Sequence, residues 1–269
     1  MPSPRMNAEL LLMFTLNCAR AYLYAHPERD LTGDELARYE AALAERARSV
    51  PAQYITGHQE FWGMDLIVTP AVLIPRPETE HVIETVLALT VVAAGPGRPP
   101  HTIRIVDVGT GSGCIALALA KELPGAEIHA ADTSAAALEI ASANAARHGL
   151  EGRIEFHQTD LLAGLGSDFD FVVSNPPYVG ESEEDQVQLE VRRFEPRNAV
   201  FAGPTGAEII ERLVPLARAA LRPGGWLVLE ISGTIVSPVE RLLESWEEVR
   251  IISDLQSIPR VVQARIPKS

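Results

Sequence analysis

Apolar and polar positions alternate with two different periods along the chain, and the change of period separates a helical beginning from a longer α/β region. Residues 7–50 place apolar side chains at helical spacing in two segments. These side chains are Leu10, Leu11, Phe14, Leu16 and Leu23 in the first segment and Leu36, Tyr39 and Leu43 in the second. The sequence Thr32-Gly33-Asp34-Glu35 is typical of a turn and cap that starts the second helix. About fifty residues are too few to fold alone with certainty, so we expect this unit to stabilise the rest of the chain or to hold a partner.

Aromatic and β-branched residues gather between positions 53 and 75. Two short runs, 60–62 and 64–68, flank Gly63 and predict a β-hairpin with Gly63 in or beside its turn. Two prolines then enclose Arg76, which is either a solvated linker charge or a group aimed at the site, and the sequence alone favours the solvated charge. We therefore divide the chain into an N-terminal helical domain (1–52), a β-hairpin linker (53–75) and a main domain (76–269).

Short apolar runs alternate with helical patterns in the main domain, and this order predicts a mostly parallel sheet. Strands are expected at residues 103–108, 127–131, 153–157, 169–174, 226–231, 249–253 and 261–265. Helices are expected at residues 79–92, 114–122, 134–148, 207–221 and 239–246. Residues 93–102, which are rich in glycine and proline, should form a loop, and the acidic run at 181–185 should form a solvated mobile loop.

The first strand leads into a glycine-rich turn, Gly109-Thr110-Gly111-Ser112-Gly113, and then into a helix that is apolar almost all round. Glycines let the backbone approach a ligand closely, and the N–H groups at a helix start offer donors to it. The second strand ends at Asp132, 19 positions beyond Gly113, where a carboxylate can accept hydrogen bonds from both ribose hydroxyls. Asp132 can alternatively be the N-cap of the following helix. The pattern predicts a nucleotide-type cofactor at this edge of the sheet.

Two further strands bring polar groups to the same edge. Asp160 follows the third strand, where a carboxylate can accept from the exocyclic amine of adenine. The fourth strand ends in Asn175-Pro176-Pro177-Tyr178, whose prolines fix φ and favour extended backbone before them. The side-chain carbonyl of Asn175 and the backbone carbonyl of Pro176 can then act as two acceptors, with the Tyr178 ring as a stacking face. This arrangement suits a planar amine or amide substrate, and the alternative is a simple strand-ending turn.

Composition narrows the class of protein. The 269 residues are 46% hydrophobic and 22% charged, which is ordinary for a soluble globular enzyme. A net charge of −13 does not favour binding to nucleic acid phosphates, although a local basic patch is compatible with it. The two cysteines, Cys18 and Cys114, indicate no disulfide framework and fit a cytoplasmic setting. The seven histidines show no metal-ligand spacing, so no metal site is predicted.

No apolar run reaches the about 18 residues of a membrane span. The apolar run at 10–16 and the small residues after it superficially fit a signal peptide, but a first amphipathic helix explains the same residues more simply.

These motifs resemble those of a known family. Strand, Gly-x-Gly-x-Gly, helix, strand and acid are similar to class I S-adenosylmethionine-dependent methyltransferases, and Asn-Pro-Pro-Tyr resembles the motif of members that methylate planar nitrogens. The match narrows to the peptide chain release factor glutamine methyltransferases (HemK/PrmC type) through the motifs at residues 53–57, 60–63, 73–80, 173–178 and 194–197. The resemblance implies a Rossmann-like methyltransferase sheet with helices on both faces, plus a small N-terminal helical domain and a β-hairpin linker.

The resemblance also implies the reaction, which is methyl transfer from S-adenosylmethionine to the side-chain amide nitrogen of the glutamine in the Gly-Gly-Gln motif of release factors. Residues 109–113 would hold the methionine end of the cofactor, Asp132 the ribose, and Asp160 with Leu161 the adenine. Leu161 stands where the family often has an aromatic residue. Asn175 Oδ1 and the Pro176 carbonyl would accept the two amide hydrogens, and Tyr178 would stack on the amide plane. A monomer that acts on a protein without direct nucleic acid contact is expected.

Three other classes of protein share parts of this pattern. A DNA or RNA base N-methyltransferase can use the same tetrapeptide but normally brings a basic recognition surface. A nucleotide-dependent dehydrogenase can use a glycine turn, yet both the Gly-x-Gly-x-Gly spacing and Asn-Pro-Pro-Tyr argue against it. A non-catalytic binding module is disfavoured because the cofactor and acceptor motifs are both intact.

Overall fold

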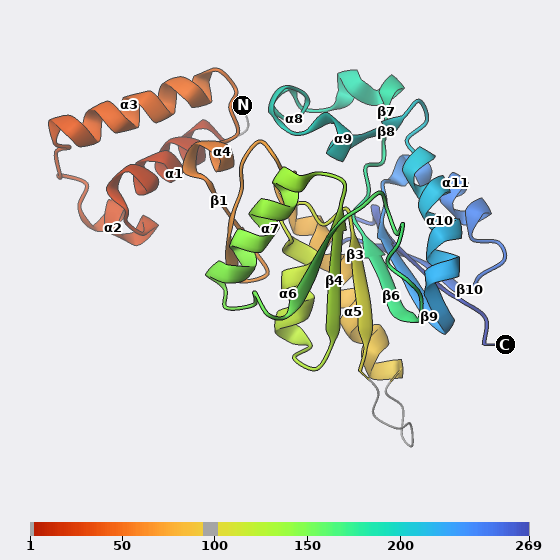
Figure 1. Cartoon of the computed structure of the whole chain (residues 1–269). Helices are drawn as coiled ribbons and strands as arrows, with labels where there is room; N and C mark the ends of the chain where they lie inside the picture. The colour runs from red at the N-terminus through yellow and green to blue at the C-terminus, as the bar shows by residue number, and fades with distance from the viewer. Residues whose placement is uncertain (1–2, 94–101, 269) are drawn as a thin grey trace.

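The computed structural model describes residues 3–93 and 102–268, which form a mixed α/β fold with a helical N-terminal region (Figure 1). The loop expected at residues 93–102 lies almost entirely outside the described residues. Within the two described ranges, no helix combines the length and the hydropathy of a membrane-spanning segment.

A seven-stranded sheet with the order β10-β11-β9-β6-β3-β4-β5 forms the centre of the fold. Its strands are β3 (Arg104–Val108), β4 (Glu127–Asp132), β5 (Ile154–Gln158), β6 (Phe169–Ser174), β9 (Leu221–Glu230), β10 (Glu247–Ser253) and β11 (Pro259–Arg265). β5, β4, β3, β6 and β9 run parallel, whereas β11 and β10 add antiparallel pairs at the other edge. The expected fold class is confirmed, although β9 begins at Leu221 rather than at Trp226.

The strand order reverses at β3, because the chain continues from β3 to β4 and β5 and then returns to the other side of β3 as β6. Such a switch point is where open α/β sheets bind ligands. Val108 of β3 pairs with Ser174 of β6, and the Ser174 hydroxyl donates to the Val108 carbonyl at 2.6 Å. Gly109 and Asn175 therefore leave the sheet from neighbouring strands at the same edge.

Helices cover both faces of the sheet (Figure 1). Successive strand residues point to opposite faces, so Ile105 belongs to one core cluster and Val106 to the other. The first cluster includes residues of α5 (Glu80–Ala93), α6 (Cys114–Glu122) and α7 (Ala135–Arg147). The second includes residues of α10 (Glu208–Ala220), η3 (Gly233–Ile235) and α11 (Val236–Leu242). The last helix begins and ends a few residues earlier than the expected 239–246.

The N-terminal region is helical and ends in a hairpin. Its elements are α1 (Pro4–Leu16), α2 (Arg20–Ala25), α3 (Gly33–Ala47), α4 (Ala52–Thr56), β1 (His58–Phe61) and β2 (Met64–Ile67), and η1 (Pro77–Thr79) precedes α5. The predicted cap is confirmed: the Thr32 side chain accepts from the Glu35 N–H, and the Glu35 carboxylate accepts from the Thr32 N–H. Gly63 lies in the hairpin turn with φ 66°, as predicted. The start of the 53–75 segment, however, belongs to the helix α4.

Residues 179–203, here termed the excursion, follow the tetrapeptide directly. They form β7 (Val179–Gly180), η2 (Glu181–Gln186), α8 (Leu189–Phe194), α9 (Arg197–Val200) and β8 (Phe201–Gly203), and β7 pairs with β8 in a separate small sheet. The prediction of a loop at 181–185 is wrong, because these residues form the 3-10 helix η2. Glu184 of that helix accepts from both Nη atoms of Arg197 at 2.9 Å. Arg46 of α3, which is buried, reaches Glu190 of α8 at 2.7 Å and joins the N-terminal region to the excursion.

Candidate functional site

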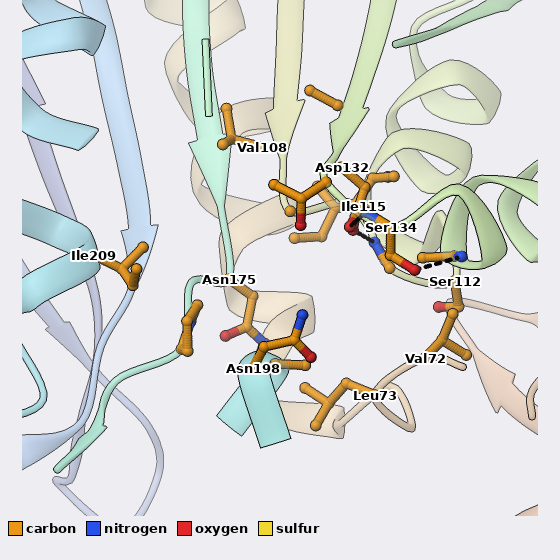
Figure 2. Close-up of a pocket in the computed structure, with 18 of the residues that line it drawn as sticks. Val72, Leu73, Val108, Ser112, Ile115, Asp132, Ser134, Asn175, Asn198 and Ile209 are labelled. Atoms are coloured by element: carbon orange, nitrogen blue, oxygen red, sulfur yellow. Dashed lines mark hydrogen bonds between the residues drawn. The ribbon is translucent and has the colours of Figure 1, made fainter. Parts of the chain in front are cut away.

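A cavity of about 300 Å³ lies at the carboxyl ends of the central parallel strands. Its walls come from the glycine turn after β3, the ends of β4 and β6, the segment after β5, residues 71–75, the excursion and α10. Figure 2 shows side chains from these elements converging on it, among them Asp132, Asn175 and Asn198. Its size is at the lower end of small-molecule pockets.

The glycine turn forms one wall of the cavity with left-handed backbone. Gly109, Gly111 and Gly113 have φ of 71°, 55° and 83°. A Cβ on Gly113 would also lie 2.5 Å from Leu117 Cδ1 and 3.1 Å from Ala141 Cβ of α7, so the close approach of α7 to this turn favours glycine there. At Gly109 no other heavy atom lies within 4 Å of an added Cβ, so the backbone itself faces open space. This leaves room for a ligand to approach the main chain.

Most N–H groups of this turn bond within the protein. Those of Gly109 and Thr110 both donate to the Ala131 carbonyl, at 2.8 and 3.0 Å, and that of Gly113 donates to Thr110. Beneath the turn, the Thr110 hydroxyl donates to Asp107 Oδ2 at 2.6 Å. Asp107 is fully buried, and this burial raises the pKa of its carboxyl to about 7. The turn is therefore a preformed wall of the cavity, and the buried Asp107 holds it in place through Thr110.

Asp132 links the glycine turn to the start of α7. Its Oδ2 accepts from the Gly111 N–H at 3.0 Å, and its Oδ1 accepts from the Ser134 N–H at 2.9 Å. The N-cap of α7 is Ser134, whose hydroxyl accepts from the Ala137 N–H, so the alternative that Asp132 caps this helix is wrong. Each carboxylate oxygen keeps a further acceptor site that ribose hydroxyls can use. Asp132 lines the cavity, as the sequence led us to expect.

Asp160 and Leu161 line the cavity after β5. Asp160 Oδ2 accepts from Arg212 of α10, which also lines the cavity and which the sequence analysis did not single out. Leu161 has a φ of 53°, a left-handed conformation that is costly for a residue with a Cβ. The surrounding structure holds it there, since its side chain packs against the second core cluster.

Asn175 stands at the cavity with its amide group fixed. Its Nδ2 donates to the Thr79 hydroxyl at 3.1 Å, which leaves Oδ1 as an acceptor. Pro177 also lines the cavity, whereas Pro176 is buried beside it. Thr79, the residue before α5, thus holds the tetrapeptide in place through Asn175.

Tyr178 packs against the second core cluster, beside the cavity rather than in its walls, and is anchored through its hydroxyl. The hydroxyl donates to Glu230 Oε1 at 3.0 Å, at the end of β9. Glu230 is 1% exposed, and burial raises its pKa while hydrogen bonds from Thr79 and Tyr178 oppose that rise. Burial and the neighbouring Glu230 likewise raise the pKa of Tyr178. Asn175, Thr79, Glu230 and Tyr178 therefore form one hydrogen-bonded chain under the tetrapeptide.

Arg76 is not a solvated charge, and the expectation from the sequence is wrong. Its Nη2 contacts Oε1 of Glu195, whose side chain is 1% exposed and whose Oε2 also accepts from the Ile74 N–H at 3.1 Å. A buried carboxylate requires a cationic partner, and Arg76 supplies it. The contact joins the cavity wall at residues 71–75 to the excursion.

Several residues of the site were not predicted. Thr79 and Glu195 lie inside the motifs at 73–80 and 194–197, but spacing alone indicates no partner for either side chain. Glu230 is an acid at the end of an apolar strand at the ligand edge. An acid in this position is the signal that identified Asp132, and the same signal could have identified Glu230. Asn198 and Arg212 carry no such signal, because their place at the cavity depends on the excursion and α10.

Comparisons of the sequence with known proteins show which family the chain belongs to. The model of the PrmC N-terminal domain matches residues 1–57, and that of the methyltransferase small domain matches residues 89–193. A release factor glutamine methyltransferase from Koribacter versatilis (strain Ellin345) is 55% identical over 272 residues, which cover 100% of this chain and 93% of the relative. One from Chlorobaculum tepidum is 44% identical, with 96% of this chain and 88% of the relative covered. The chain belongs to the release factor glutamine methyltransferase family.

Solved structures agree with this family on the fold. The ribosomal protein L11 methylase from Lactobacillus delbrueckii subsp. bulgaricus is 23% identical with a TM-score of 0.51, and the match covers 74% of this chain and 84% of that one. At this identity the likeness concerns the fold alone. The cavity fits S-adenosylmethionine, the cofactor of these methyltransferases. Its walls contain the open backbone at Gly109, the Asp132 carboxylate with free acceptor sites, and a second acid at Asp160.

Proposed function

We propose that the protein transfers a methyl group from S-adenosylmethionine to the side-chain amide nitrogen of the glutamine in the Gly-Gly-Gln motif of peptide chain release factors. The family relationship supports release factors as the substrate class. The observation that carries the chemistry is Asn175, held by Thr79 with its Oδ1 left as an acceptor, one strand away from the glycine turn.

The positions of the cavity residues support the proposed cofactor roles. Asp132 would accept from the ribose hydroxyls, Asp160 and Leu161 would border the adenine, and residues 109–113 would border the methionine end. Arg212 holds the Asp160 carboxylate in place. When bound, S-adenosylmethionine supplies an electrophilic methyl group on a sulfonium centre.

Positioning of the substrate amide is the main contribution of the tetrapeptide. Asn175 Oδ1 and the Pro176 carbonyl accept the two amide hydrogens, which aims the nitrogen at the methyl group and increases its electron density. Tyr178, fixed through Glu230, limits how the loop moves and offers its ring to the amide plane. Alignment of two bound reactants can lower a barrier by about 7 to 11 kcal/mol, so this geometry can account for much of the rate.

The protein is proposed to act as a monomer in the cytoplasm and to recognise the release factor without gripping nucleic acid. Its net charge of −13 supports recognition of a protein over recognition of a phosphate backbone. The excursion, which directly follows the acceptor loop, and the N-terminal helices, which Arg46 joins to it through Glu190, are proposed to meet the protein substrate.

The test is mass spectrometry of a purified release factor after incubation with the protein and S-adenosylmethionine. One added methyl on the Gly-Gly-Gln peptide is expected with the natural chain and with Gln256→Ala, which removes an exposed amide from the loop before β11. Asn175→Ala should reduce transfer by about 100-fold or more while cofactor binding is retained. Cofactor binding without any methyl on that glutamine would contradict the proposal, and methyl on nucleic acid would favour the base methyltransferase instead.

A further inference from the structure

Two imidazoles and a carboxylate meet on the sheet outside the cavity. His129 lies on β4, and Glu155 and His157 lie on the neighbouring edge strand β5. His129 pairs in register with Glu155, and Glu155 and His157 are two apart, so all three side chains emerge on the same face. None of the three belongs to the cavity walls.

The distances within this cluster are those of a coordination site. His129 Nδ1 lies 3.0 Å from His157 Nε2. Glu155 Oε2 lies 3.6 Å from His129 Nδ1, and Glu155 Oε1 lies 3.6 Å from His157 Nε2. In a tetrahedral zinc site with bonds of about 2.0 to 2.1 Å, ligand atoms lie about 3.4 Å apart. Movements of a few tenths of an ångström would therefore bring the three ligand atoms to the edges of such a tetrahedron.

A second carboxylate orients the buried histidine. His129 Nε2 lies 2.7 Å from Glu127 Oε1, and Arg104 Nε donates to the same oxygen at 2.9 Å. With Nε2 turned to Glu127, Nδ1 of His129 is the ring nitrogen that faces Glu155 and His157. Carboxylates bound to the outer nitrogen of a metal-binding histidine are a regular feature of zinc sites.

The surroundings of the cluster also suit a bound ion. Phe169 packs edge-on against the His129 ring at 5.2 Å between centroids and fixes its plane. Glu155 is largely exposed, so an ion can enter from solvent.

We propose that His129, Glu155 and His157 form a binding site for a zinc-class transition-metal ion that fastens the edge strand β5 to β4. Two imidazoles and one carboxylate favour zinc, cobalt or nickel over magnesium and calcium, which prefer oxygen ligands. A fourth position stays open to water. The histidine spacing in the sequence does not indicate the site, because its ligands come from two strands and lie 28 positions apart. The site is separate from methyl transfer and does not rest on that function.

The test uses the full chain without a histidine tag, titrated with zinc by calorimetry and with cobalt by visible absorption. One ion per chain and the intense absorption of tetrahedral cobalt are expected, together with a zinc-dependent rise in Tm. Glu155→Gln, an exposed change that leaves the fold intact, and His157→Ala should each weaken binding by about tenfold or more, and Glu127→Gln by about 10- to 100-fold.

His81→Ala is the matched control, since His81 pairs with Glu84 on α5 at 3.0 Å but belongs to no cluster of metal-ligating side chains among the described residues. It should leave affinity, the cobalt spectrum and the Tm shift unchanged. Equal binding by the natural chain, Glu155→Gln and His157→Ala would overturn the proposal, as would octahedral cobalt spectra or no binding by the natural chain.

Discussion

Arg76 Nη2 lies 2.5 Å from Glu195 Oε1, although the two residues are 119 positions apart. The carboxylate is buried and also accepts from the Ile74 N–H, so the contact closes residues 71–76 onto the excursion. Both stretches supply cavity walls, through Leu73 and Pro75 on one side and Asn198 on the other. The ion pair thus fixes the width of the cavity from a position outside the reacting atoms.

Arg76→Ala should destabilise the protein by about 3 to 5 kcal/mol, because it leaves the Glu195 charge buried without its partner. The double variant Arg76→Met with Glu195→Gln should recover part of that loss, since no charge remains to be desolvated. Urea unfolding of the single and double variants measures this. A single variant as stable as the natural chain would show that the pair is not required for the fold.

Thr79→Val should lower kcat by about 100-fold with little change in cofactor affinity, because Asn175 loses the hydroxyl that holds its amide. Thr79→Ser keeps the hydroxyl and should restore most of the activity. Thr85→Val is the control: it removes another buried hydroxyl, which bonds only to the His81 carbonyl one turn away on α5. Steady-state methylation assays separate kcat from KM. Equal losses in Thr79→Val and Thr85→Val would point to general destabilisation.

Tyr178→Phe should cost about 1 to 3 kcal/mol of stability, because buried Glu230 loses a hydrogen-bond donor. It should also lower kcat, since the ring is no longer anchored. Tyr24→Phe removes an equivalent tyrosine-to-glutamate bond, to Glu9, at an exposed site and should have little effect on either quantity. Denaturant unfolding and initial rates measure both. A normal kcat in Tyr178→Phe would show that the hydrogen bond from Tyr178 to Glu230 does not contribute to the reaction.

The Asp107 carboxyl predicts a pH dependence of stability. Its pKa is raised from 3.8 to about 7 by burial, so its contribution to stability is fully present below about pH 4 and is lost as the pH rises towards 7. Relative to the natural chain, Asp107→Asn should therefore become more stable by a few kcal/mol across this range. Exposed Asp168→Asn should show no such trend. Unfolding curves between pH 4 and 8 measure the difference, and a constant difference would contradict the raised pKa.

The sequence predicted the sheet and one edge of the cavity because those signals are local. Each parallel strand is a short apolar run, and the residue that ends it, such as Asp132 or Asn175, is displayed at the ligand edge by the topology alone. Contacts between distant segments were not predictable in this way. The sequence favours a solvated charge at Arg76 because Glu195 lies far along the chain. It favours a loop at 181–185 because Arg197, the partner of Glu184, is supplied by a later helix.

The pairing of Val108 with Ser174 has a consequence for how the enzyme can change over time. The next residues along the two strands, Gly109 and Asn175, begin the donor side and the acceptor side of the site, and neighbouring strands lie about 4.8 Å apart. The separation of the donor side from the acceptor side is therefore set by the backbone pairing of β3 with β6 rather than by side-chain length. Surface residues and substrate preferences can change among relatives while this pairing keeps the distance between the two reactants constant.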